Sequence, residues 1–146
     1  MKGYINTVLV PVDGSEYALR AARFGIQLAA ALEAQAKLFY VFPAASVELI
    51  GMAGISRQDI EEASQECAQR TFNQVRLGLD AEMLQRVEQE IAIGAPAEEI
   101  IARTEADPAT IVVMGRRGLS PLKTLVLGSV SEKVLRHAAV PVTVVT

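Results

Sequence analysis

The chain has 146 residues, a length typical of one domain, and 51% of them are apolar while 21% are charged, so a folded core is available and general disorder is excluded. A net charge of −3 argues against a nucleic acid or an anionic membrane surface as the partner. One cysteine, Cys67, and one histidine, His137, exclude an internal disulfide and a metal site built from several such side chains.

Segments typical of strands and helices alternate along the first part of the chain. Residues 5–12 are nearly all apolar and rich in β-branched side chains, which indicates a strand buried on both faces. Asp13-Gly14-Ser15 ends this strand, and Ser15 can cap a helix that carries apolar residues at helical spacing. Residues 38–42 predict a second short strand. Residues 43–56, which contain two glycines and scattered apolar side chains, predict a loop.

The alternation continues to the end of the chain. Helical spacing resumes with Ile60, Ala63, Cys67, Thr71 and Val75, and this stripe predicts that Cys67 is a buried, inert thiol. The remaining strands and helices are predicted, in chain order, over residues 87–93, 97–106, 110–114, 129–138 and 141–146. Strands that alternate with helices at this spacing form right-handed crossovers and a parallel sheet. The predicted fold is therefore an α/β three-layer sandwich with a five-stranded parallel sheet, in the flavodoxin-like or Rossmann-like order 3-2-1-4-5.

Polar and glycine residues follow two strands that this order brings together. Ligands of open parallel sheets bind beyond the carboxyl ends of the strands, where the strand order reverses. Asp13 follows the first strand, whereas Gly115 and Gly118 follow the fourth. We therefore expect these residues to meet in one crevice, where Asp13 either closes a turn onto Ser15 or contacts a ligand.

The segment after the fourth strand carries the sharpest signal for a ligand. It has Gly115-Arg116-Arg117-Gly118, then nine residues, then Gly128-Ser129-Val130-Ser131, and Lys123 adds to its positive charge. Glycines that adopt a positive φ, as we expect for Gly118, let backbone N–H groups approach an anion. Ser129 is predicted to cap a helix with Glu132 as its capping-box partner, and a helix N-terminus suits phosphate. The alternative is that the glycines only form turns and Ser129 is only a cap.

These motifs together resemble those of the universal stress protein family. The pattern Gly115-x2-Gly118-x9-Gly128-Ser129 is similar to the nucleotide loop of that family, and Val10-Pro11-Val12-Asp13-Gly14-Ser15 resembles its first strand and acidic turn. The segments 94–100, 111–115 and 141–145 resemble the exit of its third strand and its last two strands. The resemblance covers essentially the whole chain and is weakest over residues 43–86.

The resemblance implies a site for ATP, with or without Mg²⁺, because members of the family that retain this loop bind ATP and members that lack it do not. Asp13 would contact the ribose or adenine side of the nucleotide, or a phosphate-bound Mg²⁺, and the backbone of Val41 would meet the adenine edge. The other residues that the resemblance assigns to the pocket wall and the phosphates are Pro11, Val12, Met114, Gly115, Arg117, Gly118, Gly128, Ser129, Val130 and Ser131.

The leading hypothesis for function is a nucleotide-responsive regulator in stress tolerance, and the alternative is a slow ATPase or another nucleotide-dependent enzyme. The regulator ranks first because the sequence offers no Gly-Lys-Ser/Thr phosphate motif and no poised base. A response-regulator receiver domain is excluded because Ile93-Gly94 stands where that chemistry needs an aspartate. A flavin carrier is disfavoured because Trp is absent and aromatic residues make up only 5%.

The last predicted strand bears on partners. Residues 141–146, which start with Pro141, are apolar and uncharged and should form an edge of the sheet, so we expect a homodimer joined through this strand. A further protein partner stays undefined, and neither a nucleic acid nor a membrane is expected. We expect one cytoplasmic domain over residues 1–146, because no signal-peptide pattern and no apolar run of about 18 residues is present.

Overall fold

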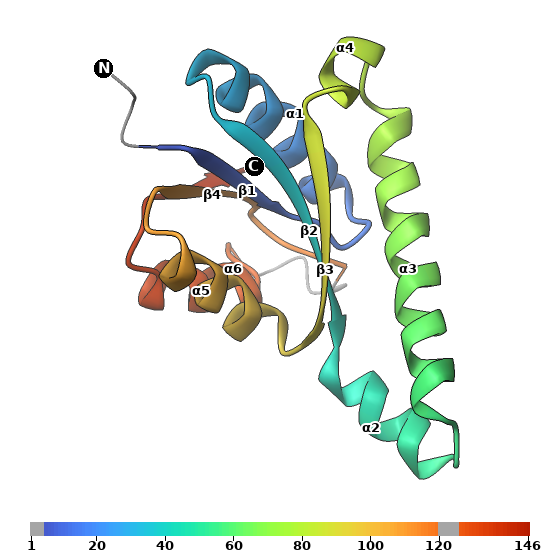
Figure 1. Cartoon of the computed structure of the whole chain (residues 1–146). Coiled ribbons are helices and arrows are strands. Elements are labelled where there is room, and N and C mark those ends of the chain that lie inside the picture. Colours follow the sequence, from blue (N-terminus) through green and yellow to red (C-terminus); the bar gives the residue numbers. More distant parts are fainter. Residues whose placement is uncertain (1–4, 120–125) are drawn as a thin grey trace.

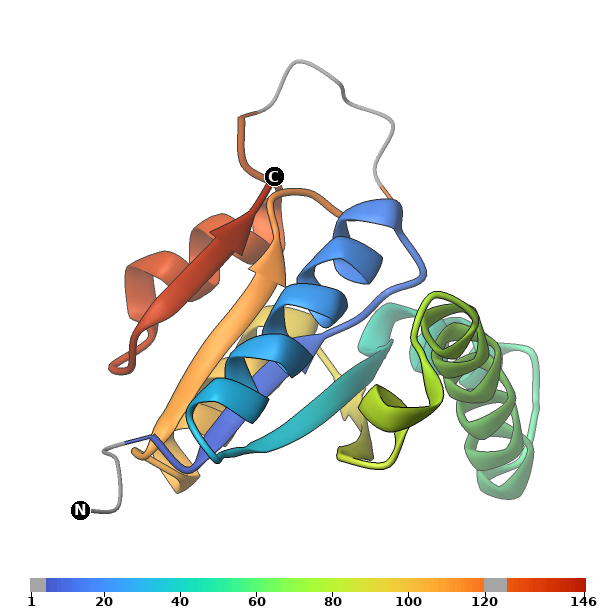
Figure 2. The same cartoon turned by 90° about the horizontal axis from the view of Figure 1, so that it is seen from above.

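In the computed structural model, which describes residues 5–119 and 126–146, helices cover both faces of a parallel sheet (Figure 1 and, from above, Figure 2). The sheet has five strands in the order β3-β2-β1-β4-β5, which confirms the predicted fold class. The strands are β1 (Thr7–Pro11), β2 (Gln35–Pro43), β3 (Val87–Gly94), β4 (Thr110–Gly115) and β5 (Val142–Val145). The helices are α1 (Glu16–Ala31), α2 (Ala44–Met52), α3 (Arg57–Leu77), α4 (Ala81–Leu84), α5 (Pro96–Ala106) and α6 (Ser129–His137).

Side chains of the central strand β1 point alternately into two cores, as the pleat of a strand requires. Val8 and Val10 are fully buried in the core under α1 and α3, while Leu9 belongs to the core under α5 and α6. The first core also contains Ala22, Ile26, Leu38, Phe72 and Val113, and the second contains Phe39, Val41, Ile100, Val112 and Val134. The continuous apolar run of β1 therefore has partners on both faces.

The start of α1 is fixed directly after β1. The Oγ of Ser15 accepts a hydrogen bond from the Ala18 N–H at 3.1 Å, so Ser15 is the helix cap that the sequence predicts. A Cβ at Gly25 would lie only 2.6 Å from the Cγ2 of Val10, so the glycine lets α1 approach the sheet closely. Cap and close packing together hold the first turn of α1 at the carboxyl end of β1.

The loop predicted over residues 43–56 is wrong, because most of this segment is the helix α2. The two glycines of the segment favoured a loop in the prediction, but Gly51 lies inside α2, and Gly54, with φ +75°, follows its end. The next helix, α3, starts at a capping box in which Ser56 and Asp59 exchange hydrogen bonds between side chain and backbone. The low helix propensity of glycine is therefore a weak guide to whether this segment is helical, because the tertiary context overrides it.

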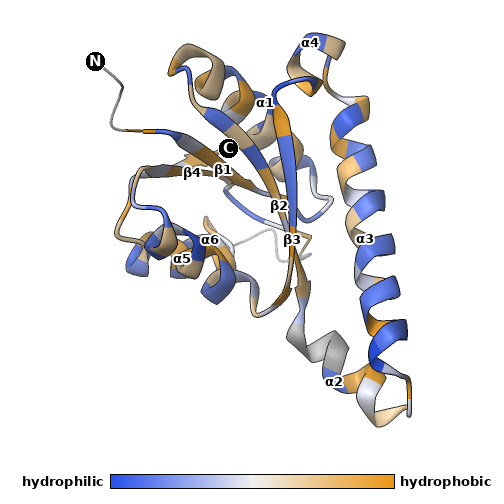
Figure 3. Cartoon of the chain, in the orientation of Figure 1, coloured by the Kyte–Doolittle hydropathy of each residue, from blue (hydrophilic) through white to orange (hydrophobic). Residues whose placement is uncertain are grey.

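The predicted stripe of α3 is correct at Thr71 and Val75, which are buried, but Ile60, Ala63 and Cys67 are half-buried rather than in the core. The buried residues of α3 are Ser64, Ala68, Thr71, Phe72 and Val75. Ser64 and Thr71 are tolerated there because each hydroxyl donates to a carbonyl of its own helix, at 2.8 and 3.1 Å. Because polar Ser64 lies in the core face, apolar spacing did not identify this face in the first half of α3. Figure 3 shows how hydrophilic most of α3 is.

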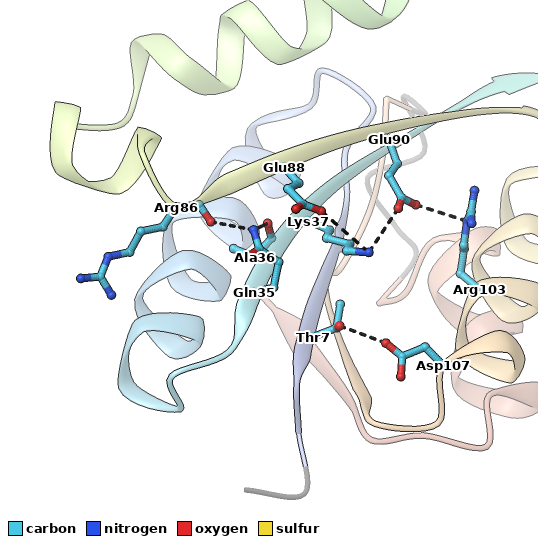
Figure 4. Close-up of polar contacts among 9 residues, drawn as sticks. All are labelled: Thr7, Gln35, Ala36, Lys37, Arg86, Glu88, Glu90, Arg103 and Asp107. Carbon is cyan, nitrogen blue, oxygen red and sulfur yellow. Dashed lines mark hydrogen bonds and ion pairs between the residues drawn. The ribbon is translucent and has the colours of Figure 1, made fainter. Parts of the chain in front are cut away.

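Charged side chains of β3 are paired with cations on the α5 side of the sheet (Figure 4). The Nζ of Lys37 in β2 lies 3.3 Å from a carboxylate oxygen of Glu90 and 3.9 Å from one of Glu88. The Nε of Arg103 in α5 lies 3.3 Å from the other Glu90 oxygen. These pairs explain how an edge strand with two glutamates joins the sheet over its full predicted length.

Candidate functional site

A cavity of about 330 Å³ opens at the carboxyl ends of β1, β2 and β4 and at the start of α6. This is the point where the strand order reverses, as expected for a ligand site of such a sheet. Every residue predicted to contact the ligand lies on the cavity wall: Pro11, Val12, Asp13, Val41, Met114, Gly115, Arg117, Gly118, Gly128, Ser129, Val130 and Ser131. The structure thus brings these residues together, and their contact with a ligand stays a prediction.

The wall also contains residues that the sequence reading missed: Ala18, Phe39, Tyr40, Pro43, Pro96, Ile100 and Leu119. Phe39 and Ile100 are almost fully buried and form apolar wall on the β2 and α5 side. Burial raises the pKa of the Tyr40 phenol above its usual range, which keeps this group neutral. Pro96 follows the third strand, so the rule that ligands bind at carboxyl ends of strands could have found it.

The N-terminus of α6 presents backbone donors at the opposite side of the cavity. The first hydrogen bond of the helix runs from the Glu132 N–H to the Gly128 carbonyl at 2.9 Å. The N–H groups of Ser129, Val130 and Ser131 precede this bond, so they have no acceptor within the helix. All three residues line the cavity. The site therefore combines backbone donors that have no acceptor in their own helix with the positive end of a helix dipole, an arrangement suited to phosphate.

The capping box predicted at Ser129 is wrong. Gly128 occupies the N-cap position, without a side-chain bond, and Ser129 is the first residue of the helix. Glu132 does not reach back to the cap, because its carboxylate accepts from the Arg136 guanidinium at 2.9 Å instead. A glycine cap contributes no side-chain oxygen to the N–H groups of the first turn, which belong to residues on the cavity wall.

The glycines of the turn after β4 are required by close approach, not by backbone angle. The described glycines with positive φ are Gly14 and Gly54, so the positive φ predicted for Gly118 is wrong. A Cβ at Gly118 would instead lie 2.4 Å from the Oδ2 of Asp13. A Cβ at Gly115 would lie 2.7 Å from the Cβ of Tyr17 in α1. A Cβ at Gly115 would push the turn away from α1, and a Cβ at Gly118 would displace either the Asp13 carboxylate or the turn.

Asp13 serves the local structure and also faces the cavity. Its Oδ1 accepts a hydrogen bond from the Ser15 N–H at 2.9 Å, so the predicted turn onto Ser15 is confirmed. Its Oδ2 points toward Gly118 across the cavity mouth. Within residues 5–119 and 126–146, no group of three or more His, Cys, Asp or Glu side chains is arranged to hold a metal. A lone carboxylate fits Mg²⁺ only when phosphates complete the ligand set, which is how Mg²⁺ is held in many nucleotide sites.

Hydrogen bonds tie both ends of the glycine-rich segment together. The Oγ of Ser131 donates to the Gly115 carbonyl at 2.8 Å, and the Gly128 N–H donates to the Arg116 carbonyl at 2.8 Å. The Arg116 N–H donates to the Val145 carbonyl of β5 at 2.9 Å. The segment thus leaves β4 and returns to α6 at fixed positions beside the cavity. Residues 120–125, with Lys123, lie outside the described part of the chain.

A larger, more open hollow of about 710 Å³ lies between α3 and β3, and it holds none of the residues predicted to contact the ligand. Two exposed carboxylates, those of Glu61 and Glu62, stand on its wall opposite Ile91 and Ile93. Carboxylates repel phosphate, and no glycine-rich turn borders this hollow. The smaller cavity at the strand ends is therefore the candidate site.

Two further expectations concern His137 and the membrane. His137 is exposed in the last turn of α6, away from the cavity, where a histidine complements the helix dipole. Among the described helices, none is long and apolar enough to cross a bilayer.

Comparisons with known proteins agree with this geometry. A universal stress protein of Methanocaldococcus jannaschii, MJ0531, is 32% identical over 138 residues, which cover 94% of this chain and 80% of the relative. The solved structure of MJ0577 from the same organism has a TM-score of 0.79 at 25% identity and covers 98% of this chain and 96% of its own. A universal stress protein solved in complex with cAMP has a TM-score of 0.68 at 23% identity, over 99% of both chains, and shares the fold.

A model of the universal stress protein family matches residues 5–146, which is nearly the whole chain. The match includes β1 with its acidic turn, the glycine-rich segment after β4, and both final elements. The chain therefore belongs to the universal stress protein family.

Proposed function

We propose that the cavity binds ATP, with Mg²⁺ on its phosphates, and that the protein acts as a nucleotide-responsive regulator in stress tolerance. The observation that carries the proposal is the N-terminus of α6 beside the turn of residues 115–118, both on the wall of a cavity at the reversal of strand order. Backbone N–H groups and a helix dipole at one side of a cavity favour a phosphate group there.

The two sides of the cavity differ in chemistry, which supports a nucleotide over a bare phosphate. Phe39, Val41 and Ile100 offer apolar surface for a base on the β2 and α5 side. Backbone donors gather on the β4 and α6 side, and Asp13 lies at the end of β1 between them. In this proposal adenine packs against the apolar wall, Asp13 contacts the ribose or the Mg²⁺, and Gly118, Ser129 and Val130 contact the phosphates.

Relatives favour a nucleotide as the ligand class. A universal stress protein that shares the fold was solved with cAMP. Since identity at that level speaks only for the fold, the choice of ATP rests on the resemblance of Gly115-x2-Gly118-x9-Gly128-Ser129 to the nucleotide loop of the family members that bind ATP. The alternative, slow hydrolysis of bound ATP, would need a group that orients water, and Asp13 is the carboxylate on the cavity wall.

We also propose that two copies pair through β5. This strand is an edge of the sheet, its residues are half-buried, and it carries no charged side chain. An apolar edge with unpaired backbone groups favours a second strand, and a two-fold axis closes the assembly. The Arg116 N–H bond to the Val145 carbonyl links this strand to the candidate site, so the pair would hold one side of the site firm.

Thermal unfolding with and without millimolar Mg-ATP tests the proposal. A ligand at 100 times its Kd stabilises the folded state by about 2.7 kcal/mol, which raises the Tm of a domain of this size by about 5–10 °C. GTP serves as the control for the base. Product analysis after long incubation separates binding from hydrolysis. An unchanged Tm with ATP would refute ATP binding, whereas a similar rise with GTP would refute recognition of adenine.

A further inference from the structure

Tyr17 in the first turn of α1 contacts both arginines of the turn that follows β4. Its phenolic oxygen accepts a hydrogen bond from the Nη2 of Arg117 at 2.6 Å and from the Nη2 of Arg116 at 3.4 Å. The guanidinium carbons of the same two arginines lie 5.2 and 5.5 Å from the centre of the Tyr17 ring. Tyr17 itself is not on the cavity wall. One side chain outside the cavity therefore contacts both arginines of the turn.

The backbone of the turn is held from other directions. The Arg116 N–H and carbonyl are bound to Val145 and Gly128, at 2.9 and 2.8 Å. The place of a Cβ on Gly115 is filled by Tyr17, whose Cβ, carbonyl carbon and carbonyl oxygen lie within 2.7–2.9 Å of it. Tyr17 thus contacts the turn twice, at its first residue through packing and at its two arginines through the phenol.

We propose that Tyr17 is a positioning residue of the nucleotide site: by binding both arginine side chains behind the turn of residues 115–118, it preorganises the backbone donors of this turn for the phosphates. The inference rests on the proposed ATP site and deepens it. A loop held in its bound conformation before the ligand arrives loses less conformational freedom on binding, and this raises affinity.

The electrostatics of the phenol agree with this role, and a third arginine near the ring offers a control. The hydrogen bonds from Arg117 and then Arg116 lower the pKa of the Tyr17 phenol below its usual value of 10.0, as expected for an acceptor that faces two cations. Arg20 of α1 also lies over the ring, at 5.5 Å, but it belongs to neither the turn nor the cavity wall. Arg20 therefore supplies a matched control for the loss of one cation from the same ring.

Calorimetric titrations of Mg-ATP and of adenosine test the inference with the wild-type chain, Tyr17→Phe and Arg20→Gln. Phenylalanine keeps the ring, and the Cβ and backbone atoms of residue 17 that pack on Gly115 are unchanged, but the acceptor is removed. A hydrogen bond from a charged donor changes the population of the conformation that it holds by about tenfold or more, and ATP affinity falls in proportion to the population of the turn that can bind it. We expect Tyr17→Phe to weaken ATP about tenfold and to leave adenosine unchanged, because adenosine does not use the phosphate donors. Arg20→Gln should bind both ligands like the wild type.

Several results would overturn the inference. Equal ATP affinity in the wild type and Tyr17→Phe would show that the phenol does not position the turn. Equal loss for ATP and adenosine would point to a general structural role, which the Tm without ligand would also report. In an Arg117→Met background, Tyr17→Phe should have a smaller effect than in the wild type, and full additivity would contradict the coupling. A wild-type chain that binds no ATP would instead refute the proposed function itself.

Discussion

Gly118→Ala is the smallest change that separates a phosphate-binding turn from a merely structural one. The added Cβ would lie 2.4 Å from the Asp13 Oδ2, well inside the 3.0 Å that real Cβ contacts respect, so either the carboxylate or the turn must move. If Asp13 moves, it loses the 2.9 Å bond from the Ser15 N–H. If the turn moves, its backbone donors leave their places at the cavity wall.

The expected effect on stability is small. The partly buried bond between Asp13 and Ser15 contributes about 1 kcal/mol. Replacing glycine with alanine restricts the unfolded chain, which contributes about 0.4–1 kcal/mol in the opposite direction. The Tm should therefore change by no more than about 3 °C. The effect on ligand binding should be much larger, because hydrogen bonds to charged groups contribute about 1.5–3 kcal/mol each, or roughly tenfold to a hundredfold in Kd.

Calorimetry with Mg-ATP, together with thermal unfolding, measures both effects. Gly51→Ala is the matched control, because Gly51 lies in α2 and a Cβ there would meet no atom within 4 Å. We expect Gly51→Ala to bind ATP like the wild type and Gly118→Ala to bind at least tenfold more weakly. If Gly118→Ala keeps wild-type affinity, the turn does not contact the phosphates and the reasoning from its glycines fails.

Two other predictions concern the edge of the sheet and the contact between α5 and α6. Val144→Lys places a charge on the edge strand β5 and should convert a dimer to a monomer in sedimentation experiments. Such an interface should hold at roughly tens of micromolar, so a wild-type chain that sediments as a monomer at that concentration contradicts the proposed dimer. The Lys133 ammonium of α6 donates a hydrogen bond to the Glu98 carboxylate of α5 and lowers its pKa, so this carboxylate stabilises the fold above its unfolded pKa of 4.5 and loses the effect as the pH falls. The difference in Tm between the wild type and Glu98→Gln should therefore be largest above pH 4.5 and disappear in acid, and a difference that persists there contradicts the pair's contribution.

The fold was predictable because its signals are local. The nearly continuous apolar and β-branched run before Asp13 indicates a strand buried on both faces. The alternation of strands and helices then indicates a parallel sheet. The elements that were missed follow from competing local rules. Gly51 favoured a loop where α2 forms. Polar Ser64 lies in the core face of α3, so apolar spacing did not identify that face in the first half of the helix.

The candidate site was predictable to the extent that topology sets it. Residues that follow β1 and β4 had to meet once the strand order was known, and the cavity wall contains them. Contacts that depend on side-chain geometry could not be predicted from the sequence. Tyr17 and Arg117 are 100 residues apart in sequence, and nothing in either local pattern indicates that they touch. The same holds for Gly118, whose role depends on a distance to Asp13 rather than on a turn type.

The location of the nucleotide is tested most directly by following backbone amide resonances in a titration of the wild-type chain with Mg-ATP. The account predicts that the amides of Gly118, Ser129 and Val130 shift most and saturate together, because their N–H groups gain a charged acceptor. The shifts should be much smaller with adenosine. Saturating ATP that leaves these three amides unmoved, or that instead shifts those of Ile91 and Ile93 beside the hollow at α3, would contradict the account.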